Sequence, residues 1–380
     1  MEDTLSYQLY ASRSRRHGVN LRLRRMAFAR AHEQHQAMMG SSARNTTGNS
    51  NSTPSQPSLQ QTMQSQPGVM GSTYDDLPLD PREYDAIDRE DPFLPSFEHA
   101  CQHGPVSTVQ SLVSSQTPPQ PRTRSFLHHG LIVALHVGNI DIARYLLSVG
   151  APILRLTPDN ILNAPLDQQI PLFELLLQYG WTVDTPAYYG AVFLPRVVDK
   201  PHLFHWFLRH GANPNLGEQR DTHDRDGGPD TDSCDALERA AGQGNVEAVR
   251  LLLDAGAEIQ NGIPLHYAAG TCPPGTSPYD RGVTSSKEFD TSRIPVMALL
   301  VERGADVNKE HNSRHMVARY AILLAVMAGA VERVRWLLEH GADPELKGPY
   351  GSAVTYATTM RSEEMRSVLD EWVRAKKVDK

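Results

Sequence analysis

The amino-acid sequence predicts an all-α fold of stacked helical repeats, preceded by a largely disordered N-terminal region. Three observations predict it. An apolar pair or triple, two variable residues and a glycine recur six times between residues 145 and 341. The segment before each glycine has apolar residues at helical spacing. Residues 41–72 contain one charged residue and no aromatic residue, so they cannot bury enough apolar surface to offset the entropy of the chain.

The recurring glycines define the length of the unit. They are Gly150, Gly180, Gly211, Gly256, Gly304 and Gly341. The intervals of 30, 31, 45, 48 and 37 residues indicate a unit of about 30–33 residues with insertions. A second glycine lies twelve residues earlier in three copies, as Gly138 does before Gly150, which predicts a helix-turn-helix unit. We expect each closing glycine to adopt the left-handed conformation that ends a helix.

The motifs within these units resemble the ankyrin-repeat family. Residues 262–270 read GIPLHYAAG, which matches the family's helix-opening motif except for Ile263 in place of the usual Thr. Residues 304–308 (GADVN) and 211–215 (GANPN) match its closing element. The resemblance covers roughly residues 94–373. It implies an α-solenoid of about eight helix-turn-helix units joined by short β-hairpin fingers, and a non-catalytic scaffold or adaptor that binds another protein.

Composition divides the chain into four parts, and two insertions interrupt the repeats. The parts are an Arg-rich, partly helical head (1–40), a Ser/Gln/Asn-rich disordered linker and lead-in (41–92), the repeat array (93–375) and a basic tail (376–380), and the insertions are 217–232 and 271–292. The end units are degenerate, as is usual for capping repeats. Because the unit around 158–180 lacks the early glycine, we expect its first helix to be short or irregular.

The two insertions differ in character. Insertion 217–232 lengthens a finger and holds six acidic residues against two arginines. A calcium-loop interpretation fails, because Thr222 and Ser233 fall where the loop needs Asp and Glu. We expect a solvated, mobile acidic loop, and the sharper hypothesis is that it presents charge to a basic partner. Insertion 271–292 falls between the two helices of one unit, and its Pro, Gly, Ser and Thr content predicts a disordered excursion loop.

The resemblance places partner binding on the concave surface of fingers and first helices. Aromatic residues in the fingers are the best candidates for contact, since such side chains dominate binding energy when they anchor in a pocket. Packing between adjacent fingers would explain them about equally well. The candidate partner-binding residues are Trp181, Tyr188, Tyr189 and Tyr350, together with Asp221, Asp224 and Asp226 of the acidic insertion.

Charge is unevenly distributed along the chain. The head carries seven arginines and three acids, which leaves −11 for the remainder because the whole chain has a net charge of −7. An acidic array lacks the continuous basic face that nucleic acid requires. The head resembles a two-part nuclear import signal, with an amphipathic surface-binding helix or plain solvated charge as alternatives. The arginines concerned are Arg13, Arg15, Arg16, Arg22, Arg24 and Arg25.

The remaining features favour a soluble, intracellular chain without a cofactor. The three cysteines lie far apart with no metal-binding spacing, and we find no phosphate loop, nucleophile elbow or membrane-spanning run. We therefore expect no metal, no cofactor and no catalysis. We predict a monomer in the cytoplasm or the nucleus with one or more protein partners. The alternative is a nuclear regulatory subunit whose Arg-rich head engages nucleic acid or import machinery while the array recruits a protein.

Overall fold

The structure is a computed structural model that describes most of the repeat region. The described residues are 93–114, 121–221, 224–278, 282–312 and 318–378. All described residues belong to one compact unit. The head, the linker and the last two residues of the basic tail lie outside the described residues.

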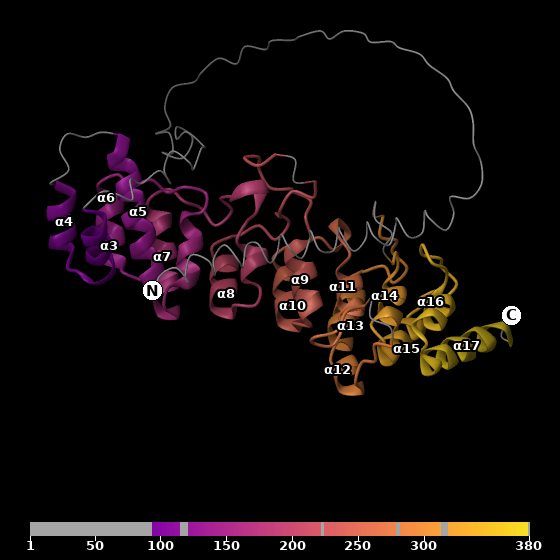
Figure 1. The fold of residues 1–380 in the computed structure, drawn as a ribbon. Helices are drawn as coiled ribbons and strands as arrows, with labels where there is room; N and C mark the ends of the chain where they lie inside the picture. Colours follow the sequence, from indigo (N-terminus) through magenta and orange to yellow (C-terminus); the bar gives the residue numbers. More distant parts are fainter. Residues whose placement is uncertain (1–92, 115–120, 222–223, 279–281, 313–317, 379–380) are drawn as a thin grey trace, which may run out of the picture. The chain divides into compact units, whose positions relative to one another are not determined.

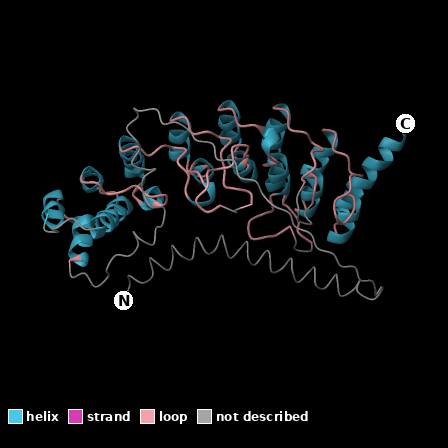
Figure 2. Cartoon of the chain, turned by 90° about the horizontal axis from the view of Figure 1, so that it is seen from above, coloured by secondary structure: helices cyan, strands magenta, loops and turns pink. Residues whose placement is uncertain are grey.

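Regular structure in the described residues consists of helices joined by loops (Figure 2). The only strand-like pairing there is two isolated bridges, Gly217 with Asp230 and Gly348 with Gly351. The family resemblance led us to expect short β-hairpin fingers, and this expectation is wrong for the described residues. Their connections are turns and loops, because each makes too few backbone pairs to form a strand.

Many of the helices that follow one another along the chain lie side by side in pairs, such as α9 and α10 (Figure 1). In order, they are α3 (Leu94–His103), α4 (Val106–Ser114), α5 (Pro121–Val137), α6 (Ile140–Ser148), η1 (Thr157–Asn163), α7 (Leu166–Gln178), η3 (Leu194–Val197), α8 (Pro201–Arg209), α9 (Asp235–Gln243), α10 (Val246–Asp254), α11 (Pro264–Gly270), α13 (Ile294–Glu302), α14 (Ala321–Met327), α15 (Val331–Glu339), α16 (Ala353–Met360) and α17 (Glu363–Val378). Three short helices lie in the connections: η2 (Tyr188–Gly190), η4 (Ile259–Asn261) and α12 (Lys287–Thr291).

Each helix pair packs against the next, so that the buried residues form one continuous core. Helix α11 contacts both α9 and α14, and α14 contacts α16 in turn. Paired alanines line the contact between α9 and α11. Ala240, Ala241, Ala268 and Ala269 are all fully buried. Their small side chains let the first helices of neighbouring pairs approach closely, as the sequence predicts.

The closing glycines have the left-handed conformation that the sequence predicts. At the six positions from Gly150 to Gly341, φ lies between 80° and 97°. A Cβ at any of these six positions would meet nothing within 4 Å. The backbone conformation, rather than a lack of space, is therefore what requires glycine there.

Two units have a 3-10 helix in place of a first α-helix. The irregular first helix expected around 158–180 is confirmed, because η1 is a 3-10 helix with Pro158 in its first turn. Helix η3 has the same form, with Pro195 in its first turn. Both units thereby depart from the pattern of two α-helices.

Candidate functional site

The acidic insertion 217–232 between α8 and α9 folds back on itself. Gly217 and Asp230 exchange two backbone hydrogen bonds of 3.1 and 3.0 Å. The Gln219 side chain is buried, and its Nε2 donates to the Gly228 carbonyl oxygen at 3.0 Å. A long loop pinned at its base and at its tip holds its side chains in fixed positions. The solvated loop that we expected from composition therefore has a defined conformation in its described residues.

The insertion docks on helix η2 of the preceding connection. The Tyr189 amide donates to the Arg225 carbonyl oxygen, and the Gln219 amide donates to the Tyr189 carbonyl oxygen, both at 2.8 Å. Tyr189 has a φ of 57°, a left-handed conformation that is costly for a residue with a side chain. Gly190 also has a positive φ, and a Cβ there would overlap the Gly228 carbonyl oxygen. The two connections thus fit together only with glycine at position 190.

Two arginines strengthen this docking. Arg155, in the connection that follows α6, donates from Nη1 to the Ala187 carbonyl oxygen at 3.2 Å and from Nη2 to the Asp226 carbonyl oxygen at 2.6 Å. It therefore ties η2 and the insertion to the unit before them. The Arg225 guanidinium lies 4.2 Å from the centre of the Tyr188 ring, a cation–π distance.

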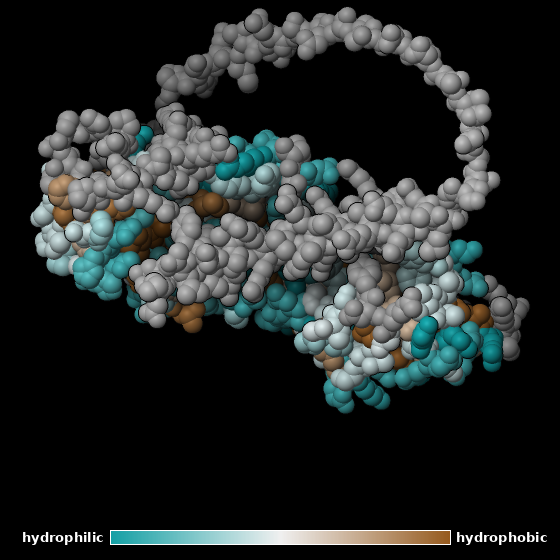
Figure 3. Space-filling model, in the orientation of Figure 1, coloured by the Kyte–Doolittle hydropathy of each residue, from teal (hydrophilic) through white to brown (hydrophobic). Residues whose placement is uncertain are grey.

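Both arginines of the insertion contact other protein groups, Arg220 the carboxylates of the insertion and Arg225 the Tyr188 ring, whereas several carboxylates face solvent. Arg220 donates from Nη1 to the Asp232 carboxylate at 3.2 Å, and its amide donates to the Asp230 carboxylate at 3.0 Å. Figure 3 shows hydrophilic residues over the insertion, at the upper edge of the described unit. Further exposed acidic residues of the insertion are Glu218, Asp221 and Asp224. The structure therefore presents a negatively charged surface here.

Trp181 is not a surface residue, which corrects its assignment as a candidate contact. Its exposed fraction is 2%, and its ring packs against Phe173, Phe193 and Phe207 with centroid distances of 5.4 to 6.2 Å. The residue after the closing glycine is alanine in the other five units, and four of those alanines are buried. That position in the repeat was the sequence signal for burial.

The other candidates differ in accessibility. Three candidates are partly buried where η2 meets the insertion: Tyr188, Tyr189 and Asp226. Tyr350 is 59% exposed, in the loop before α16. Sequence reasoning missed Tyr267, which is 47% exposed on α11 and borders Gly242 of the preceding first helix. Its place in the PLHYAAG motif, on the helix face away from the core, could have identified it.

Buried cysteines are poor nucleophiles in this structure. Burial raises the pKa of Cys101 to about 12 and also raises the pKa of Cys234, so both thiols stay protonated at neutral pH. His103 lies on α3 with Cys101 and packs against His99. Within the described residues, no cluster of three or more His, Cys, Asp or Glu side chains could hold a metal ion. The helices described there are also too short or too polar to cross a membrane.

The Arg-rich head cannot be placed in this arrangement. Arg13, Arg15, Arg16, Arg22, Arg24 and Arg25 lie outside the described residues. The proposed import signal stays a prediction from the sequence.

The family comparison matches one of the helix pairs. The model of the ankyrin repeat matches residues 319–349, which include α14, α15 and the closing Gly341. Residues 319–349 thus form an ankyrin repeat. Ankyrin repeats are in general protein-binding modules, so the matched repeat implies protein partners for this chain. No curated protein matches the sequence.

The matched ankyrin repeat also shows how neighbouring units are joined. Asn308, from the closing element of the preceding unit, donates to the Gly341 carbonyl oxygen and accepts from the Asp343 amide, each at 2.9 Å. Asn215 makes the same two bonds to Gly256 and Glu258, again at 2.9 Å. The same residue type thus makes the same contact outside the matched residues.

Proposed function

We propose that this protein is a non-catalytic adaptor. In this proposal about eight units, from α3 to α17, form one array that binds a protein partner on the concave face made of first helices and preceding loops. The repeated asparagine contacts and the stacking of first helices support the unit count. Exposed Tyr267 and Tyr350 come from a first helix and from a preceding loop, and both would belong to that face.

The docked acidic insertion is the observation that carries the proposal. The insertion is held in a fixed geometry by Tyr189, Arg155 and its own Gln219, so that its charged side chains are presented in a defined arrangement. Its arginines contact Asp232 and the Tyr188 ring, while Glu218 and Asp221 are exposed. A surface of this charge favours a partner with a basic segment. The partner is therefore proposed to be a basic protein.

The test is a charge-only change in the insertion. Asp221→Asn with Asp224→Asn removes two charges, and the side-chain oxygen at position 224 can still accept the hydrogen bond from the Asp226 amide, which is 3.1 Å long in the wild type. A partner isolated with the wild-type chain should bind this variant on the order of fivefold to tenfold more weakly at low salt, with a smaller difference at high salt. The affinity is measured by calorimetry or surface plasmon resonance.

A matched variant controls for net charge. Glu174→Gln with Glu339→Gln removes two exposed charges from the second helices α7 and α15, and binding should stay within about twofold of the wild type. Equal affinity of the wild type and the Asp221/Asp224 variant would show that the insertion is only a spacer. Equal weakening by both variants would mean that net charge matters and the insertion does not.

A further inference from the structure

Insertion 271–292 contacts the helix pair that follows its own. It lies between α11 and α13, but its last part forms α12, which packs against α15. The Ser285 amide donates to the Gly329 carbonyl oxygen at 3.1 Å, and a Cβ at Gly329 would overlap the Val283 carbonyl oxygen. The expectation of a disordered excursion loop is therefore wrong for the part of the insertion described here. This part is a packed element of the fold.

Asp290 of this insertion binds the first turn of α15. Its side chain is 2% exposed. One carboxylate oxygen accepts from the Glu332 amide at 2.6 Å, and the other accepts from the Arg333 amide at 3.3 Å. These amides have no partner within their own helix, so a carboxylate there acts as an N-cap. Asp290 supplies this cap from 42 residues away.

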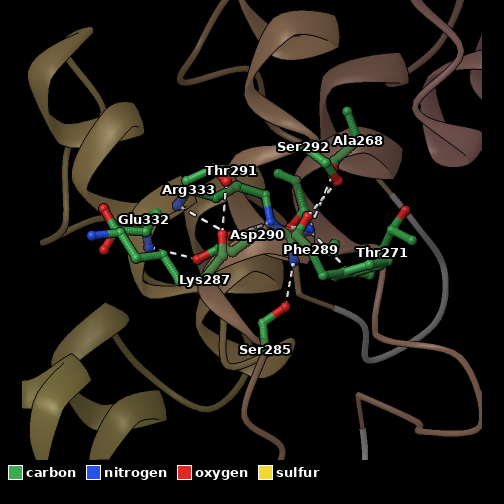
Figure 4. A network of polar contacts seen from close by, with 12 residues as sticks. Ala268, Thr271, Ser285, Lys287, Phe289, Asp290, Thr291, Ser292, Glu332 and Arg333 are labelled. Carbon is green, nitrogen blue, oxygen red and sulfur yellow. Dashed lines mark hydrogen bonds and ion pairs between the residues drawn. The ribbon is translucent and has the colours of Figure 1, made fainter.

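Arg333 of α15 binds both Asp290 and the end of α11 (Figure 4). Its side chain is fully buried, and Nε donates to Asp290 at 2.6 Å. Nη1 donates to the carbonyl oxygens of Ala269 at 2.7 Å and Thr271 at 2.9 Å, at the end of α11. Burial lowers the pKa of Arg333, and Asp290 opposes that effect. One ion pair thus joins the start of α15, the end of α11 and the insertion between α11 and α13.

Two other second helices, α6 and α10, differ from α15 at their first turn. Helices α6 and α10 have their own N-caps, Asn139 and Asn245, each of which accepts from the amide three residues on. Three residues after these caps lie the buried apolar side chains of Ile142 and Ala248. In α15 the cap position holds Ala330, which has no side-chain acceptor. The residue three positions on is the buried Arg333. Helices α7, α8 and α13 also lack a side-chain cap of their own, but α15 receives a carboxylate from the insertion.

We propose that residues 282–292, the last part of this insertion, are a clasp that closes the contact between two consecutive repeats, and that α15 depends on Asp290 for its first turn. Withdrawing α12 alone would leave Arg333 buried without a counter-charge, which is strongly unfavourable. Opening of the clasp and fraying of α15 are therefore one event. The folding of the helix pair α14–α15 then depends on an element that belongs to the pair before it.

The first experiment compares two acids of the same short helix in the full chain. Asp290→Ala removes the clasp carboxylate, whereas Glu288→Ala removes an exposed acid of α12. We expect Asp290→Ala to lower the thermal midpoint by about 5 °C or more and to speed hydrogen exchange at the Glu332 and Arg333 amides. Glu288→Ala should stay within about 1 °C of the wild type. A midpoint for Asp290→Ala that matches the Glu288→Ala control would overturn the proposal.

The second experiment makes α15 independent of the clasp. Ala330→Asn with Arg333→Met gives α15 the asparagine cap, and the apolar residue three positions after it, that α6 and α10 have. In this background Asp290→Ala should cause no loss of the thermal midpoint, because no buried charge and no uncapped turn remain. The same loss in both backgrounds would contradict the clasp. If Asp290→Ala alone does not fold, Asp290→Asn, which keeps one acceptor oxygen, replaces it in both arms, and the comparison is unchanged.

Discussion

At the scale of single residues, repeat position predicts burial better than residue type. The aromatic character of Trp181 pointed to a contact surface, but its position after a closing glycine is a core position, and its ring lies among three phenylalanines. Tyr350 lies outside such a position and is exposed. The buried ion pair of Asp290 and Arg333 was not predictable, because the two charged residues lie 43 positions apart and no sequence pattern links them.

Buried histidines make the stability of the protein dependent on pH. His128 and His266 are 5% and 2% exposed, and burial lowers the pKa of each to about 4. His128 Nε2 lies 2.9 Å from the Thr157 hydroxyl, and His266 Nε2 lies 3.1 Å from the Arg319 carbonyl oxygen. A protonated ring would have to leave these sites or remain charged in the core.

The expected result is a loss of stability in mild acid. Because the folded pKa lies below the unfolded value of 6.5, the unfolded chain binds more protons between pH 6.5 and pH 4, and stability falls as the pH falls through this window. Each histidine should cost about 2 kcal/mol between pH 7 and pH 5. Denaturant unfolding at the two pH values measures it. His128→Gln with His266→Gln should flatten the dependence, and an unchanged slope would assign it to other groups.

At the scale of elements, local pattern predicts the helices and long-range contacts decide the insertions. Apolar periodicity and glycine position predicted the helix ends, because a closing glycine acts within its own turn. The irregular first helix η1 was also predictable, from the missing early glycine. The docked conformation of insertion 217–232 depends on Arg155 and Tyr189, which lie in earlier units. Composition alone made that segment resemble a free loop.

Gly190 tests whether the docked insertion behaves as one element. Gly190→Ala introduces a Cβ where the Gly228 carbonyl oxygen lies and strains a positive φ. We expect insertion 217–232 to undock, with faster hydrogen exchange at Gln219 and Tyr189 and faster proteolysis in the insertion. Gly228→Ala is the control, because a Cβ there meets nothing within 4 Å. Unchanged exchange in Gly190→Ala would show that the close approach does not hold the insertion in place.

At the scale of the whole molecule, a helical array that contains an ankyrin repeat carries two insertions, to which we assign different roles. Residues 282–292 are proposed to lie within the scaffold as a clasp, and insertion 217–232 to lie on the binding surface. The sequence located both insertions and showed the resemblance to ankyrin repeats, because a repeat is recognised by its period. It could not distinguish their roles, since the clasp depends on one buried ion pair and the surface depends on which charges remain exposed.

The central claim is that a protein partner binds the face of first helices and preceding loops. Site-specific photo-crosslinking tests it most directly, with a photoreactive amino acid placed singly at Tyr189, Tyr267 or Tyr350 and, for comparison, at Arg209 or Arg250 of the second helices α8 and α10. We expect a purified partner to crosslink from the three tyrosine positions and not from the two arginine positions. Crosslinking from Arg209 or Arg250 with none from the tyrosine positions would contradict it.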